Sequence, residues 1–179
     1  MRWALWENAS PLTRRVITII ILFIIAVFIV AMGTLTPINK HEAGELSDEL
    51  NKSINTLEEN GLILQYIFGN NFMIALLMFV PVVGLIFGGY VLYNTGVVIA
   101  ASAIANDLNP TLAVFLLFFV PVAWLEFAAY STAMAESIWL TRRIFQRRGK
   151  HELVNATKFI SICAILLLLA AIIETALIT

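Results

Sequence analysis

The sequence predicts an all-α protein, a polytopic transmembrane helical bundle of about five spans with a short or broken third segment. Of its 179 residues, 60% are hydrophobic and only 13% are charged, whereas about a quarter of an average globular chain is charged. The apolar residues stand in long runs, and the charges gather in the short segments between them. We therefore treat residues 1–179 as a single membrane domain.

The first expected element is a transmembrane helix over residues 16–33. An uninterrupted apolar run of 17 residues extends from Val16 to Met32. Three arginines precede it, and Trp3 and Trp6 suit a membrane interface. The small-residue cleavage pattern of a signal peptide is poor here, so we expect a retained span.

Residues 34–60 are the one sizeable polar region and are expected to form an acidic extracytoplasmic loop with a short amphipathic helix. The segment from Lys40 to Glu59 holds two lysines and six acidic residues. Four apolar residues recur at helical spacing: Leu46, Leu50, Ile54 and Leu57. Such a thin stripe favours a solvated helix on the protein or the lipid headgroups over a partner-docking face.

Residues 61–179 are expected to form a helical bundle. A second span fits Phe72–Tyr93, with Asn70 and Asn71 capping its start and Asn94 closing it. The remaining expected segments are a short one over Val97–Ala105, a long helix over Thr111–Leu140 and a last span over Leu153–Ile178.

Charge asymmetry predicts the orientation. The N-terminus and the loop from Thr141 to Glu152 are basic, and basic loops stay in the cytoplasm. The chain would then cross the cell membrane an odd number of times, with a cytoplasmic N-terminus and an extracytoplasmic C-terminus. Five crossings fit if the short third segment crosses. A re-entrant third segment would place the basic loop outside, which is disfavoured.

The bundle contains an internal repeat. Residues 76–90 and 116–130 match at nine of fifteen positions, including a proline and a tyrosine. In the five-span arrangement the two copies run in the same direction, as a parallel repeat. Transporters often place sites at repeat interfaces, but the match covers one helix only, which favours a duplicated packing module.

Small residues in the first copy predict close helix packing. Gly84 and Gly88 form a Gly-x-x-x-Gly pair, and Gly89 and Gly96 widen this smooth face. The close neighbour could belong to the chain or to a partner. Pro121 and its counterpart in the first copy should kink their helices and free carbonyl groups, which polar neighbours can satisfy.

Glu126 stands where the first copy has Ile86. A carboxylate inside an apolar helix is costly and usually faces the bundle interior. It could serve a proton or ion relay, or it could make a structural hydrogen bond to Asn94, Ser102 or Tyr90. We favour the structural bond, because no Lys, Arg or His lies at comparable depth in the expected spans.

Two further carboxylates lie near span ends. Glu136 is one helical face away from Arg143, and an interfacial pair is expected. Glu174 is near the end of the last span, where it could reach the outer interface or a partner in the bundle. No nucleophile, base and orienting group come together in the sequence, so no catalytic, cofactor, metal or nucleic-acid site is expected.

Several short motifs carry a family resemblance: "FGNNFMIALL", "NTGVVIAA", "PVAWLEFAAY" and "AAIIETALIT". With them the chain resembles the stage II sporulation protein M family over roughly Phe68 to Thr179. The resemblance points to Asn70, Asn71, Asn94, Gly96, Pro121, Glu126 and Glu174. Three positions depart from the family pattern: Val122 replaces a His, Ala123 replaces a Gly, and Thr95 is inserted after the asparagine.

The resemblance implies a non-enzymatic, partner-binding membrane protein. In spore formers the family works as a scaffold in an engulfment complex with cell-wall hydrolases, but most relatives occur in organisms that do not sporulate. We therefore expect a structural or accessory subunit of a larger membrane complex, in contact with lipid and with other integral membrane subunits, and possibly homo-oligomeric. The alternative is a small transporter or channel component that uses Glu126 in an ion or proton path.

Overall fold

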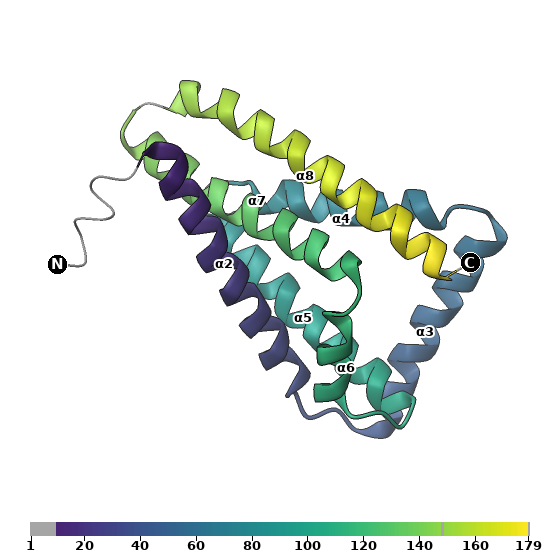
Figure 1. Ribbon diagram of the computed structural model, residues 1–179. Coiled ribbons are helices and arrows are strands. Elements are labelled where there is room, and N and C mark those ends of the chain that lie inside the picture. The colour runs from purple at the N-terminus through teal and green to yellow at the C-terminus, as the bar shows by residue number, and fades with distance from the viewer. Residues whose placement is uncertain (1–9, 148, 179) are drawn as a thin grey trace.

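A computed structural model describes residues 10–147 and 149–178. The described residues form helices without strands, which confirms the predicted helical membrane bundle (Figure 1). The helices are α2 (Pro11–Thr34), α3 (Lys40–Glu59), α4 (Ile63–Met78), α5 (Val83–Ala105), α6 (Pro110–Leu117), α7 (Pro121–Phe145) and α8 (Gly149–Ile178). Trp3 and Trp6, the expected interface residues, lie outside the described residues.

Helix α2 contains the whole predicted first span and starts five residues before it. Ser10 caps the helix by accepting a hydrogen bond from the Thr13 amide at 3.1 Å. Pro11 suits the first turn, because its missing N–H would have no intrahelical partner there. This early start places Arg14 and Arg15 inside the helix.

By length and composition, three helices can each cross a membrane: α2, α5 and the Leu153–Ile178 part of α8. The pair α6 and α7, bent by 83° at its break, would make a fourth. Helix α4 is apolar but has only 16 residues, against about 20 for a straight span. A total of five therefore requires the short α4 to cross as well.

The expected single helix over Phe72–Tyr93 is wrong, because the chain breaks between α4 and α5. Pro81 lies in the break and cannot donate a helical hydrogen bond. Val82 has a φ of 67° and a ψ of −55°, and its neighbours close a tight turn in which the Val83 amide donates to the Pro81 carbonyl at 2.8 Å. The expected short segment over Val97–Ala105 is simply the last part of α5.

The repeat copies run in opposite directions, so the predicted parallel repeat is wrong. The start of α5 lies beside the end of α7, where the Val82 amide donates to Thr141 Oγ1 at 2.9 Å. Further along α5, Gly88 faces Met134, which is earlier in α7. Because the break at Pro81 reverses the chain, α5 and α7 become antiparallel neighbours.

At each break a side chain of α7 donates to a backbone carbonyl, as expected of polar neighbours, and the Val80 carbonyl also accepts from the Gly84 amide at 2.8 Å. Ser137 donates its hydroxyl to the Val80 carbonyl at 2.7 Å. The indole N–H of Trp124 donates to the Phe118 carbonyl at 2.8 Å. Pro121, at the second break, is the first residue of α7. The prolines therefore end helices rather than bend continuous ones.

Helix α7 forms the centre of the bundle, and α2 and α8 lie on either side of it (Figure 1). Every residue from Ala129 to Ser137 is buried. The outer faces carry large exposed apolar side chains, among them Ile86 at 73% and Phe119 at 84% exposure. A buried centre and an apolar exterior are the arrangement that lipid requires of a helical bundle.

Helix α3 is the expected amphipathic helix and lies across one end of the bundle (Figure 1). Its N-cap is Asn39, whose side chain accepts from the Glu42 amide at 2.9 Å. Lys40 contacts Asp107, after the end of α5, with 2.6 Å between Nζ and Oδ1. Ala43 is completely buried and anchors the helix on α5.

Candidate functional site

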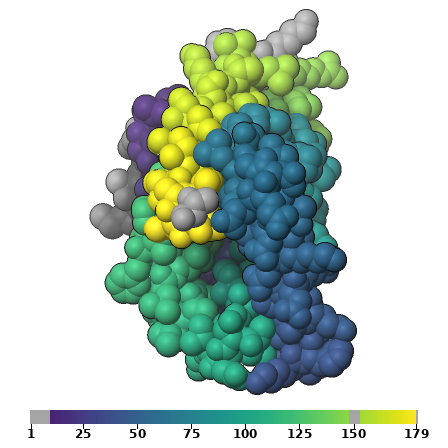
Figure 2. All heavy atoms as spheres, turned by 90° about the vertical axis from the view of Figure 1, so that its right-hand side faces the viewer, coloured from purple at the N-terminus to yellow at the C-terminus, as the bar shows by residue number. Residues whose placement is uncertain are grey.

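A pocket of about 300 Å³ lies between α3 and the end of the bundle, and we call it the α3 pocket. Helix α3 covers it with part of the predicted apolar stripe. Figure 2 shows α3 lying over this face beside the C-terminal end of α8. The lining residues are Leu50, Ser53, Ile54, Leu57, Ile63, Tyr66, Ile67, Asn70, Asn71, Glu126, Glu174 and Ile178.

Four residues that the family resemblance singled out come together in this pocket. Asn70 and Asn71 come from α4, Glu126 from α7 and Glu174 from α8. They are separated by up to about a hundred positions in the chain but line one space. The structure thus places in one pocket four residues whose proximity the sequence did not predict.

Glu126 is hydrogen-bonded to Asn71, whose Nδ2 donates to its Oε1 at 2.6 Å. The bond ties α4 to α7. A structural hydrogen bond was expected, but the expected partners Asn94, Ser102 and Tyr90 were wrong. Those three residues belong to α5, whereas Glu126 faces α4, because the break at Pro81 gave α4 a separate position.

Glu174 is half-buried in the last turns of α8. It meets the bundle, which was one of the two expected positions, and it faces the same pocket as Glu126. No Lys, Arg or His is among the described residues that line the pocket. Two carboxylates therefore share a partly apolar space without a cationic side chain in its wall.

The two asparagines do not cap a helix. Asn70 and Asn71 lie in the middle of α4, which begins at Ile63. Asn94 lies inside α5 and donates to the Tyr90 carbonyl one turn earlier at 2.8 Å. The capping predictions were wrong because both helices extend well beyond the apolar stretch that was used to bound them.

The glycines of α5 are used for packing within the chain. A Cβ on Gly84 would overlap the Met78 carbonyl, and one on Gly88 would lie 2.5 Å from the Met134 sulfur. Gly96 is packed against α2, where a Cβ would overlap the Val30 carbonyl oxygen. These contacts hold the α4–α5 turn and the α2–α5 crossing together.

Gly89 differs from these glycines, because a Cβ there would meet no atom within 4 Å. It lies on the outer side of α5, between the exposed side chains of Ile86 and Tyr90. Of the predicted packing glycines in α5, it is the one with open space beside it.

A second polar cluster, which sequence reasoning missed, lies near the other end of α7. Arg15 of α2 forms an ion pair with Glu136, and Arg15 Nη1 lies 2.6 Å from Oε1. Arg15 is 8% exposed and Glu136 is 1% exposed. The expected pairing of Glu136 with Arg143 was therefore wrong.

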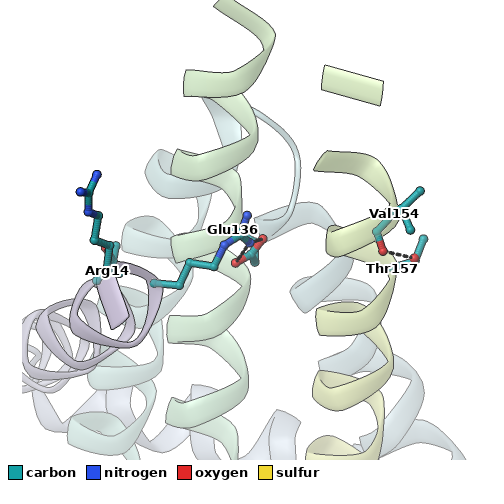
Figure 3. Close-up of polar contacts among 6 residues, drawn as sticks. Arg14, Glu136, Val154 and Thr157 are labelled. Carbon is teal, nitrogen blue, oxygen red and sulfur yellow. Dashed lines mark hydrogen bonds and ion pairs between the residues drawn. The ribbon is translucent and has the colours of Figure 1, made fainter. Parts of the chain in front are cut away.

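The Glu136 side chain points toward α2, and Arg14 points away from it (Figure 3). The Arg15 guanidinium lies over the rings of Trp139 and Phe159, at 5.6 and 5.5 Å from their centroids. The pair thus joins three helices, since Phe159 belongs to α8. The signal that could have revealed it is Ser10 followed by Pro11, a helix start that places Arg15 inside the span.

The chemistry of the two clusters is that of ion pairing and hydrogen bonding. Among the described residues, no group of three His, Cys, Asp or Glu side chains is placed to hold a metal ion. The Arg15–Glu136 pair is closed off by aromatic rings. The α3 pocket has carboxylate and amide groups that can accept hydrogen bonds and balance a positive charge.

Comparison with known proteins gives one match. The family model described as stage II sporulation protein M matches residues 16–178. No curated protein and no solved structure is significantly similar to the chain.

Proposed function

The chain belongs to the stage II sporulation protein M family, and we propose that it acts as a non-catalytic structural or accessory subunit of a larger membrane complex. The observation that carries this proposal is the position of α3. This 20-residue helix lies across one end of the bundle and is joined to it by the ion pair between Lys40 and Asp107 and by buried Ala43. Its charged face is left exposed.

The exposed face of α3 is suited to binding a partner. Glu42, Glu45 and Glu49 lie on one side of the helix, at spacings of three and four residues, and all are exposed. The apolar side chains opposite them are directed to the α3 pocket. A rigid acidic surface complements a basic segment of another protein, and such complementarity guides association.

The bundle beneath α3 supports a scaffold role. Asn71 and Glu126 tie α4 to α7, and Arg15 and Glu136 tie α2 to α7. Polar contacts of this kind between transmembrane helices fix one arrangement of the bundle. A fixed bundle presents α3 in a constant position, as a scaffold requires.

The test is co-purification from native membranes in mild detergent. We expect the wild-type chain to bring other integral membrane proteins with it in fixed proportion. The triple variant Glu42→Lys/Glu45→Lys/Glu49→Lys should lose them, because its surface would repel a basic partner. Lys52→Glu is the matched control: it also reverses a charge on α3, but extends the acidic face, and should keep the partners.

Circular dichroism of the purified variants verifies that each remains helical. If the triple variant retains the same partners in the same proportion as the wild type, α3 is not the docking surface. If the wild-type chain purifies as a monomer or as a homo-oligomer alone, the accessory-subunit function is wrong.

The orientation is part of the proposal: the chain lies in the cell membrane with its N-terminus in the cytoplasm and with α3 and its C-terminus outside. The natural cysteine, Cys163, is completely buried. A cysteine introduced by Asp48→Cys on exposed α3 should therefore react with a membrane-impermeant maleimide in intact cells. Labelling that requires permeabilised membranes would reverse the orientation.

The α3 pocket favours a second candidate, a small transporter or channel component that uses Glu126. The convergence of Glu126 and Glu174 on one pocket is the observation in its favour. This candidate predicts ion or proton flux into proteoliposomes that Glu126→Gln abolishes, while the helical content remains. Equal flux in the wild type and the variant would exclude it.

A further inference from the structure

The carboxylates of the α3 pocket have unused hydrogen-bonding capacity. The bond from Asn71 to Glu126 Oε1 is the one hydrogen bond that the described residues make to either carboxylate. A carboxylate offers about four acceptor sites. In a partly apolar pocket an ionised carboxylate is costly unless a positive group or hydrogen-bond donors face it. The pocket therefore has acceptors directed at a space that no Lys, Arg or His of the described residues lines.

A third acceptor lies beside them. Asn70 lines the same pocket, and its Nδ2 lies 3.4 Å from Asn71 Oδ1. The side-chain oxygen of Asn70, Oδ1, is thus the atom available to a ligand. Together with Glu126 and Glu174, it makes three acceptors on three different helices. A primary ammonium group has three N–H donors, which matches this number.

The other walls of the pocket are hydrocarbon. Leu50, Ile54 and Leu57 cover it from α3, and Ile63 and Ile178 close its sides. At about 300 Å³ it has the size of the smaller pockets that hold organic ligands. A hydrated metal ion would find no third acidic ligand among the described residues, and it would leave the apolar walls unmatched.

We propose that the α3 pocket binds a small amphipathic organic cation, a protonated alkylamine. Its ammonium group lies between Glu126 and Glu174 and donates to Asn70, and its alkyl part lies against the apolar side chains of α3. Because α3 forms one wall and the bundle forms the others, the bound ion holds α3 onto the bundle. This inference goes beyond the subunit function and requires no transport across the membrane.

The test uses the purified full-length chain in detergent, with hexylammonium chloride as the probe and isothermal titration calorimetry as the readout. Detergent micelles alone give the blank. We expect saturable binding of hexylammonium. Hexan-1-ol has the same alkyl part without the charge and should bind at least about tenfold more weakly, which is the loss that removal of a charge-assisted hydrogen bond produces.

Two variants test the carboxylates separately. Glu174→Gln removes a charge without removing a hydrogen bond that the structure shows, and Glu126→Gln keeps an oxygen that can accept from Asn71. Each should weaken hexylammonium binding about tenfold or more. Asp48→Asn removes an exposed carboxylate of α3 that does not line the pocket and is the matched control, with unchanged affinity expected. Circular dichroism shows whether each variant remains folded.

Several results would overturn the proposal. One is hexan-1-ol binding as tightly as hexylammonium, and another is unchanged affinity in Glu174→Gln. Binding that does not saturate above the micelle blank would also overturn it. If sodium chloride displaces hexylammonium at equal concentration, the pocket takes an inorganic cation and the alkylamine assignment is wrong. These results leave the co-purification test of the subunit function untouched.

Discussion

The ion pair between Arg15 and Glu136 gives the sharpest prediction about the bundle. Replacing Glu136 by Leu removes the carboxylate but leaves the guanidinium at a position that is only 8% exposed. The Arg15 side chain is held there by the Trp139 and Phe159 rings, so it cannot move freely to water. The single variant therefore leaves a buried guanidinium without the Glu136 carboxylate.

The cost follows from the burial of both partners. Breaking a buried pair by removing one partner costs about 3–5 kcal/mol. Removing both partners in Arg15→Leu/Glu136→Leu avoids leaving the guanidinium without that carboxylate and loses the two cation–π contacts, worth about 0.5–2 kcal/mol each. We therefore expect the double variant to be more stable than the single variant Glu136→Leu. Glu136→Gln, which keeps an acceptor for Arg15, should lie between the wild type and Glu136→Leu.

The assay is a denaturant titration of each purified variant in detergent, followed by circular dichroism, with the four free energies of unfolding combined in a double-mutant cycle. Arg14→Leu is the control, because Arg14 points away from Glu136 (Figure 3). Whatever Arg14→Leu costs by itself, its effect should add to that of Glu136→Leu, with a coupling energy below about 0.5 kcal/mol. If the effects of Arg15→Leu and Glu136→Leu simply add, the two residues are not coupled and the reasoning is refuted.

Three further predictions concern helix packing and use the same titration. Gly96→Ala should lower the free energy of unfolding by about 1–3 kcal/mol, because its Cβ would overlap the Val30 carbonyl. Gly89→Ala is the control and should be neutral. Equal effects of the two substitutions would disprove the close crossing of α2 and α5. Thr141→Val should cost about 0.5–1.5 kcal/mol, because it removes the hydrogen bond to the exposed Val82 amide. Val82→Gly should not destabilise the chain, because glycine tolerates a φ of 67°; a large loss would contradict the strained turn.

Hydropathy and helical spacing predicted the membrane class, the first span and the amphipathic α3, because these features depend on local sequence. The run from Val16 to Met32 can be buried only in lipid or protein, and the stripe through Leu50 and Ile54 can be buried only on one side of a helix. Such patterns hold whatever the rest of the chain does. The structure confirms all three.

Pairings between distant helices could not be predicted. The partner of Glu126 depends on which helix faces it, and that depended on whether Pro81 bends a helix or ends it. In the structure the helix ends at Met78, before Pro81. As a result α4 brings Asn71 to Glu126, and α5 turns back along α7. The direction of the repeat and the span boundaries were wrong for this same reason. The break in the helix at Pro81 therefore determines several contacts between residues that are distant in the sequence.

The convergence of Glu126 and Glu174 also lay beyond sequence reasoning from composition or spacing. Both were singled out as carboxylates in apolar helices, and the family resemblance pointed to them again, but neither observation placed them together. Their shared pocket exists because α8 runs back along α7 and brings its last turns beside the first turns of α7. Cys163, which donates to the Ala129 carbonyl at 3.4 Å midway along this pair, shows that antiparallel register.

The central claim, that the chain is an accessory subunit, is tested most directly by the mass of the native assembly. Native mass spectrometry of the chain, released from its own membranes in mild detergent and freed of its purification tag, compares the assembly with the 19.9 kDa of a single copy. The account predicts a heteromeric mass that falls to that of the chain alone in the Glu42→Lys/Glu45→Lys/Glu49→Lys variant. A wild-type mass equal to 19.9 kDa, or to a whole multiple of it, would contradict the account.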